Sequence, residues 1–139
     1  MIRGLVAIAL LVASVAGAAA TTLVAEVDLS DQSLTVIYKG EALATFPVST
    51  GRAGYRTPPG RFRPQRMYRD YYSRQYDGAP MPHAIFYDRG YAIHGSWETG
   101  SLGRPASHGC VRLHPADAQT LFDLVLTVGS ENTSVLVRR

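Results

Sequence analysis

Apolar and polar residues alternate along the front half of the chain, and this alternation constrains the fold more than any other feature of the sequence. Successive side chains of a β-strand point to opposite faces, so a period of two predicts strands that bury one face. The alternation runs through residues 23–29, 34–38 and 42–48, with polar turns at 30–32 and 39–41. We therefore expect three antiparallel strands joined by tight turns.

The second half of the chain predicts shorter strands. Residues 84–87 and 91–93 are apolar and flank a turn, Phe62 opens a short strand after a proline–glycine turn, and residues 134–137 form a closing strand. Residues 64–82 show no period, and we interpret them as a long loop. Loops of this length are uncommon in small domains and often carry functional residues.

Only one segment has the pattern of a helix. Pro115 suits a first helical position, Asp117 suits the first turn, and Gly129 can end the helix. The apolar residues of this segment are spaced as on one helix face: Ala118, Leu121, Phe122 and Val125. The expected fold is therefore a single domain, mainly β, with one short helix.

Residues 1–20 are expected to be a signal peptide that is removed. A positive start at Arg3 precedes an apolar run from Gly4 to Ala16, and Ala18-Ala19-Ala20 offers the small residues of a cleavage site. The apolar run is short for a bilayer span of about 20 residues. We expect a mature domain of residues 21–139 in the periplasm or cell envelope, not bound to a membrane.

The charge of the chain is mild. The formal net charge of +3 at pH 7 does not by itself indicate nucleic-acid binding, and export argues against that partner. Seven arginines nevertheless lie between Arg52 and Arg74, and five of the eight tyrosines fall in or just after that stretch.

Cys110 is the only cysteine, so it cannot form an internal disulfide. In an exported protein it either pairs with another molecule or reacts as a free thiol. A thiol attacks carbonyls as thiolate and needs a nearby base. His94, expected at the end of a strand, is better placed as that base than His108, for which structural and catalytic roles both stay open.

Two glycines beside these residues allow a close approach of the backbone. Gly95 could offer its carbonyl to the second imidazole nitrogen of His94, which would set the tautomer without a carboxylate. Gly109 lets the chain bend before Cys110, so that backbone N–H groups could face an oxyanion, a contribution of about 10²–10³ in rate. The alternative for Cys110 is burial as a small apolar residue, which its polar neighbours disfavour.

A zinc site is a competing use of the same side chains. Its donors would be His94, His108, Cys110 and His114, but their spacing fits none of the usual paired patterns. We therefore expect no metal and no organic cofactor. His114 is interpreted as a helix-start residue and His83 as a loop residue.

Three motifs resemble those of the bacterial L,D-transpeptidases, the YkuD-like catalytic domain. They are Thr57-Pro58-Pro59-Gly60-Arg61-Phe62, Ile93-His94-Gly95-Ser96 and Gly103-Arg104-Pro105-Ala106-Ser107-His108-Gly109-Cys110-Val111-Arg112-Leu113. The similarity covers nearly all of residues 22–138. It implies a sheet that forms a sandwich or barrel-like structure.

The resemblance implies a role for each matching residue. Cys110 would be the nucleophile, His94 the general base and acid, and the carbonyl of Gly95 would orient the imidazole. His108 would assist near the oxyanion. Arg112 would contact a carboxylate of the donor peptide, for which a guanidinium is suited. Further candidates for substrate binding are Ser107, Trp97, Tyr71, Tyr72 and Met81.

The arginine- and tyrosine-rich stretch has two interpretations. The first is a solvated basic face whose tyrosines pack on the core. The second is a lid over a substrate rich in carboxylates, such as a peptidoglycan stem, to which Tyr71, Tyr72 and Met81 would belong.

The implied function is peptidoglycan L,D-transpeptidation, which contributes to cell-wall organisation and cell shape. The cysteine would form a thioester with the third stem residue, release the terminal D-alanine, and transfer the acyl group to an amine of a second stem in a 3→3 cross-link. Carbapenems would acylate the same cysteine. Hydrolysis by an L,D-carboxypeptidase or amidase, and attachment of a lipoprotein through its lysine, stay open. A non-catalytic wall-binding module is the alternative from another class.

Overall fold

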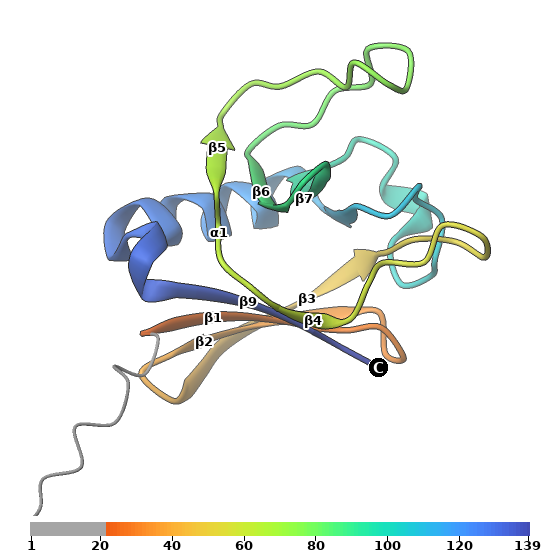
Figure 1. Ribbon diagram of the computed structural model, residues 1–139. Coiled ribbons are helices and arrows are strands. Elements are labelled where there is room, and N and C mark those ends of the chain that lie inside the picture. The colour runs from red at the N-terminus through yellow and green to blue at the C-terminus, as the bar shows by residue number, and fades with distance from the viewer. Residues whose placement is uncertain (1–21) are drawn as a thin grey trace, which may run out of the picture.

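The computed structural model describes residues 22–139, which form a curled sheet with one α-helix packed against it (Figure 1). The strands are β1 Leu23–Asp28, β2 Ser33–Tyr38, β3 Glu41–Ser49, β4 Gly60–Phe62, β5 Arg66–Tyr68, β6 Ala84–Asp88, β7 Tyr91–Gly95, β8 Val111–Leu113 and β9 Thr133–Arg138. The helix α1 spans Pro115–Val128, and the short 3₁₀ turns are η1 Thr99–Ser101 and η2 Ser130–Asn132. The expected signal peptide, residues 1–20, lies outside the described residues.

The alternating segments form the three strands that their pattern predicts. β1 pairs antiparallel with β2, and β2 pairs antiparallel with β3. The apolar residues of the alternation in β1 and β2 are buried: Leu23, Ala25, Val27, Leu34 and Val36. The prediction of three antiparallel strands is therefore confirmed.

The sheet curls until its two edges approach each other. Its strand order is β4-β9-β1-β2-β3-β8-β7-β6-β5, so β4 and β5 are the edge strands. Only residues 63–65 separate these two strands in the chain. The long strand β3 joins the two halves, because its first part pairs with β2 while Val48 and Ser49 pair with β8. The expected mainly β fold with a barrel-like sheet is confirmed.

Helix α1 covers β6, β7 and β8. As predicted, Pro115 is its first residue, and Gly129 follows its end with a φ of 96°. His114 caps the start, where its Nδ1 accepts the N–H of Ala116 at 3.1 Å. The buried face consists of Ala118, Leu121, Phe122 and Val125. Each large apolar side chain buried in this way contributes about 1.5–3 kcal/mol.

One expectation is partly wrong, and two features of the sheet are not predicted by the sequence. Residues 64–82 are not a loop throughout, because Arg66–Tyr68 forms β5 and pairs with β6. The strand β8 was not predicted, since three residues are too few to show a period. The closing strand β9 exists, but it pairs parallel with β1, a direction that no local pattern reveals.

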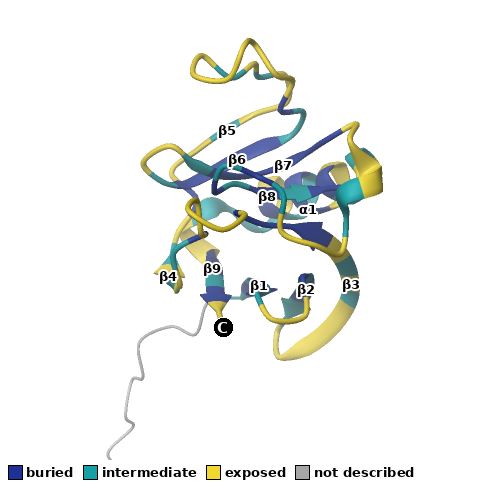
Figure 2. Cartoon of the chain, turned by 90° about the vertical axis from the view of Figure 1, so that its right-hand side faces the viewer, coloured by how far each residue is buried: buried dark blue, intermediate teal, exposed yellow. Residues whose placement is uncertain are grey.

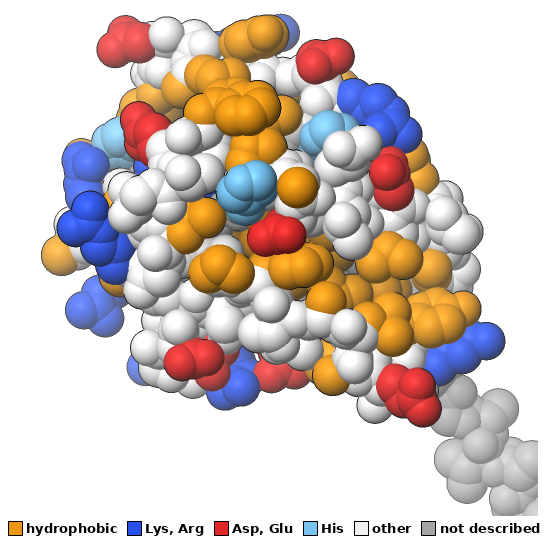
Figure 3. Space-filling view, turned by 180° about the vertical axis from the view of Figure 1, so that it is seen from behind, with side chains coloured by type: hydrophobic (Ala, Val, Ile, Leu, Met, Phe, Trp, Pro, Cys, Tyr) orange, Lys and Arg blue, Asp and Glu red, His pale blue; other side chains and the backbone are white. Residues whose placement is uncertain are grey.

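The loop between β5 and β6 is mostly exposed, whereas β6, β7 and β8 are largely buried (Figure 2). On the face seen in Figure 3, hydrophobic and acidic side chains are mixed, and several basic side chains lie together along the left edge. Of the helices in residues 22–139, none is both long enough and apolar enough to cross a bilayer.

Candidate active site

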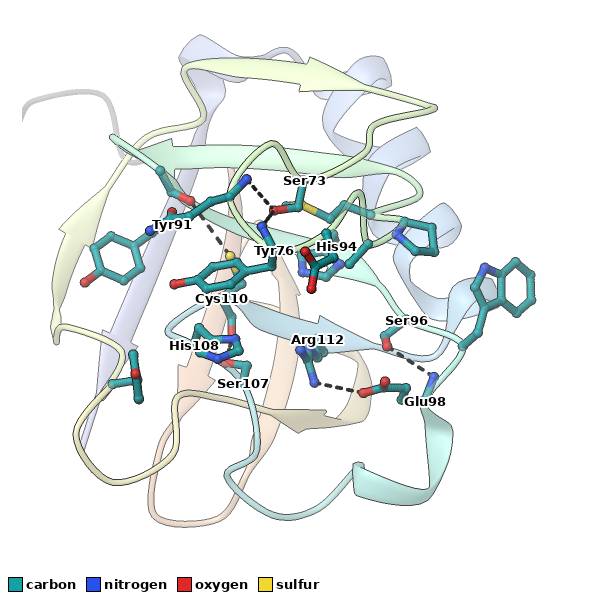
Figure 4. Close-up of a pocket in the computed structure, with 18 residues that line it drawn as sticks. Ser73, Tyr76, Tyr91, His94, Ser96, Glu98, Ser107, His108, Cys110 and Arg112 are labelled. Atoms are coloured by element: carbon teal, nitrogen blue, oxygen red, sulfur yellow. Dashed lines mark hydrogen bonds and ion pairs between the residues drawn. The ribbon is translucent and has the colours of Figure 1, made fainter.

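The register of two strands brings the histidine, the cysteine and an arginine to one face. β7 and β8 pair in parallel, with His94 opposite Arg112. Cys110 precedes Arg112 by two residues, so its side chain lies on the same face of the sheet. All three side chains line one cleft with a volume of about 960 Å³ (Figure 4).

His94 is a neutral base with one nitrogen held in place. Its Nδ1 lies 2.7 Å from the carbonyl oxygen of Gly95, and because a carbonyl only accepts, Nδ1 carries the proton. The lone pair of Nε2 then remains available. Burial lowers the pKa of His94 to about 4, the hydrogen bond to Gly95 opposes this shift, and the charge of Arg112 adds to it. The imidazole is therefore neutral at pH 7.

The backbone at Gly95 is fixed by the start of α1. A Cβ at this position would lie 3.1 Å from Cα of Pro115 and 3.1 Å from Cγ of Pro82, closer than side chains normally pack. The Gly95 N–H also donates to the carbonyl of Pro82 at 2.8 Å. Glycine thus allows the helix to pack against residue 95, whose carbonyl accepts the hydrogen bond from His94.

Cys110 has a partly buried thiol, whose Sγ lies 3.8 Å from the carbonyl oxygen of Gly90. Burial raises the pKa of this thiol, while a backbone hydrogen bond from Ala92 and the charge of Arg112 oppose the rise. Because the pKa of His94 is lowered, the resting pair consists of a thiol and a neutral imidazole, not of a thiolate and an imidazolium.

The bend before Cys110 is held by two buried hydroxyl groups. Ser107 Oγ donates to the carbonyl of Cys110 at 2.6 Å and accepts the N–H of Gly109 at 3.0 Å. Thr57 Oγ1 donates to the carbonyl of Gly109 at 2.8 Å. Gly109 has a φ of 126°, and a Cβ there would come within 2.5 Å of the ring of Tyr91. Glycine is therefore required at this bend.

These contacts involve two groups for which other roles are expected. The N–H of Gly109, expected to face an oxyanion, is instead engaged with Ser107 in this structure. Ser107, expected to bind substrate, lines the cleft but is 1% exposed. Its hydroxyl is hydrogen-bonded to the backbone of residues 109 and 110. Its contacts make Ser107 a support for the bend.

His108 is held between two tyrosines and an arginine. Tyr76 stacks on its ring with centroids 4.1 Å apart, and Tyr55 meets it edge-on at 5.0 Å. Arg52 Nη2 donates to His108 Nε2 at 3.2 Å. Burial of the ring lowers the pKa of His108, and the charges of Arg52 and Arg112 add to the shift. His108 therefore links the cysteine bend to the long loop, and its assisting role stays a prediction.

The loop residues that reach the cleft are mostly not those expected. Met81 lines the cleft, but Tyr71 and Tyr72 are not among its lining residues. Tyr71 packs edge-on against Phe86 at 5.0 Å, and Tyr72 is 64% exposed. Tyr76 lines the cleft instead. No local pattern distinguishes Tyr76 from the other tyrosines, because its partner His108 lies far along the chain.

The short loop after His94 forms the other wall of the cleft. Trp97 lines the cleft, as expected for a substrate-binding candidate, and is 69% exposed. Glu98 Oε2 lies 3.3 Å from Arg112 Nη1, and the N–H of Glu98 donates to Ser96 Oγ at 3.2 Å. Arg112, expected to bind a donor carboxylate, is therefore already paired with a carboxylate of its own chain.

The four side chains weighed as zinc donors do not form one group. Within residues 22–139, no three His, Cys, Asp or Glu side chains gather as a metal site would require. His114 caps α1, and His83 packs edge-on against Phe122 at 5.4 Å.

Residues 22–137 match the family model of the L,D-transpeptidase catalytic domain, and the chain belongs to this family. The YkuD protein of Bacillus subtilis (strain 168) is 25% identical over 103 residues, which cover 71% of this chain and 58% of that protein.

Solved structures share the fold. An L,D-transpeptidase from Mycobacterium smegmatis has a TM-score of 0.74 at 26% identity, covering 85% of this chain and 59% of the other. One from Stackebrandtia nassauensis has a TM-score of 0.74 at 28% identity, covering 85% and 56%. The LD transpeptidase LdtMt1, solved in complex with imipenem, has a TM-score of 0.73 at 27% identity, covering 84% and 59%. The chain thus spans less than two thirds of the length of each of these relatives.

Proposed function

We propose that this protein is a peptidoglycan L,D-transpeptidase that acts through a thioester on Cys110. One observation carries the proposal: a neutral histidine whose Nε2 is unprotonated lines the same cleft as the only thiol of the chain. Membership of the L,D-transpeptidase catalytic domain family supports the class of reaction.

In the first half of the reaction, Nε2 of His94 takes the thiol proton as Sγ of Cys110 attacks the carbonyl between the third stem residue and the terminal D-alanine. The tetrahedral intermediate collapses when the C–N bond breaks, and His94 returns the proton to the departing amine. Such positioned proton transfer contributes about 10²–10⁴ in rate. The products are D-alanine and a thioester.

In the second half, an amine of another stem attacks the thioester carbonyl. His94 takes a proton from that amine, the C–S bond breaks, and the thiol is restored with a 3→3 cross-link as product. The oxyanion of each intermediate would bind N–H groups of the bend, for which Gly109 exchanges its bond with Ser107 for one with the substrate oxygen.

The proposal extends to a class of inhibitor and to a location in the cell. A relative was solved with imipenem, a carbapenem, and we propose that carbapenems acylate Cys110. The proposed signal peptide would carry the protein to the periplasm, where its partners would be peptidoglycan stem peptides.

Incubation of the purified protein with a disaccharide-tetrapeptide tests the proposal. Mass spectrometry of the products should show cross-linked dimers that have lost one D-alanine, and Cys110→Ala should abolish them. Tripeptide as the only product would overturn the transferase assignment in favour of an L,D-carboxypeptidase. Substrate left unchanged by the wild-type protein would overturn the enzymatic assignment and favour a wall-binding module.

A further inference from the structure

The cleft beside Cys110 contains charged side chains of both signs. Within the described residues, the charged side chains that line it are Asp77, Glu98 and Arg112, two carboxylates and one guanidinium. The two histidines in the lining both have lowered pKa values and are neutral at pH 7. Arg52 donates to His108, and His108 lies on the other side of Arg112 from Glu98 (Figure 4). An exposed carboxylate at Glu98 therefore attracts cationic ligands when it is not paired with Arg112.

The ion pair in this cleft is asymmetric. The side chain of Arg112 is 20% exposed, whereas that of Glu98 is 75% exposed. Figure 4 shows Arg112 between His108 and Glu98. An ion pair with an exposed carboxylate contributes little free energy, so breaking it costs little. A carboxylate of the acyl donor can therefore replace Glu98 on Arg112.

The backbone of Glu98 is held beside the cleft independently of its pair with Arg112. Its backbone N–H is bonded to Ser96 Oγ at 3.2 Å, and it directly precedes the η1 turn. Ser96 in turn lies one residue beyond Gly95, at the end of β7. A carboxylate without a cation is then left at the mouth of the cleft.

We propose that Glu98 is a specificity-determining residue for the acceptor, an inference that rests on the proposed function. Its carboxylate attracts the ammonium group of the acceptor amine while Arg112 is engaged by the donor. The ammonium loses one proton to solvent, and the neutral amine attacks the thioester carbonyl. His94 takes a second proton from the attacking nitrogen and passes it to the departing sulfur as the C–S bond breaks. Water carries no charge, so Glu98 favours transfer to amines over hydrolysis.

The test compares a charged and an uncharged acceptor on the acyl-enzyme formed from a tetrapeptide donor. Nα-acetyl-lysine amide carries one ammonium and no carboxylate, and hydroxylamine is uncharged at neutral pH and yields a hydroxamate. The kcat/KM for each acceptor is measured with wild type, Glu98→Gln and a matched control, Glu41→Gln. Glu41 is exposed at the start of β3 and is not among the cleft-lining residues, so the control removes the same charge elsewhere.

Glu98→Gln should lower kcat/KM for the lysine derivative by about threefold to fivefold, the size of one exposed ion pair, and leave hydroxylamine unchanged. Glu41→Gln should leave both values unchanged. The difference between wild type and Glu98→Gln in kcat/KM for the lysine derivative should vanish in 1 M salt, where the screening length falls to about 3 Å. The inference would be overturned if the ratio of the two kcat/KM values were the same in Glu98→Gln as in wild type, whether or not both values had fallen. Failure of the wild type to form any acyl-enzyme would instead overturn the proposed function.

Discussion

At the scale of single residues, the protonation states of Cys110 and His94 decide how the site would work. The lowered pKa of His94 and the raised pKa of Cys110 leave both groups neutral at rest. The proton would then move as the sulfur attacks, not before. A site of this kind keeps its thiol less reactive until a substrate is bound.

The reactivity of the thiol toward iodoacetamide checks this state. The chain has one cysteine, so the alkylation rate reports Cys110 alone. Only the thiolate reacts, and burial raises the pKa of this thiol. We expect the rate to rise with pH through an inflection above about 8.5, the ordinary value for cysteine. A rate that stays high down to pH 6 would indicate a thiolate–imidazolium pair and contradict this account.

The sequence indicated the central residues of the site but not their neighbours. The bond between His94 and the Gly95 carbonyl is present as the motif led us to expect, because both groups belong to adjacent residues. The stack of Tyr76 on His108 and the pair of Glu98 with Arg112 were not predicted. Such contacts join separate loops, and their geometry exists only once the sheet has formed.

At the scale of elements, the bend at residues 107–110 is the most constrained segment. Gly109→Ala would place a Cβ 2.5 Å from the ring of Tyr91 at a φ of 126°. Gly40→Ala is the matched control, because Gly40 also has a positive φ, 83°, with open space around it. Urea denaturation should show a loss above about 2 kcal/mol for Gly109→Ala and about 1 kcal/mol for Gly40→Ala. Equal losses would mean that the ring of Tyr91 does not restrict the bend.

The long loop should be held to the bend by the ring of Tyr76. Tyr76→Ala removes the stack on His108, so trypsin should cleave after Arg74 several-fold faster than in wild type. Tyr72→Ala is the control, since Tyr72 is 64% exposed and in the same loop. Identical cleavage rates for the two variants would show that the stack does not restrain the loop.

Elements were predictable where their patterns are long. The alternation of residues 23–48 and the apolar face of α1 repeat often enough to identify strands and a helix. The strands β5 and β8 have three residues each, and pairing with neighbours defines them. The parallel pairing of β1 with β9 depends on the path of the whole chain.

At the scale of the whole molecule, burial of a neutral histidine couples stability to pH. His94 has a folded pKa of about 4, below the ordinary value of about 6.5 for an unfolded chain. Between these values the unfolded chain binds a proton that the folded protein does not, so the free energy of unfolding falls as pH falls.

The stability of His94→Gln relative to wild type measures this coupling. Between pH 7 and pH 4, urea denaturation should show that the wild type loses about 3 kcal/mol more than the variant, which has no imidazole to protonate. Other titrating groups are common to both proteins and cancel in the difference. Equal losses would mean that His94 is not buried in its neutral form.

Intact-mass spectrometry after incubation with imipenem tests the central claim most directly. The wild type should gain the mass of one imipenem molecule, Cys110→Ala should gain none, and His94→Gln should react far more slowly because no base accepts the thiol proton. An adduct on Cys110→Ala, or a wild-type protein that stays unmodified, would contradict the assignment of Cys110 as the nucleophile.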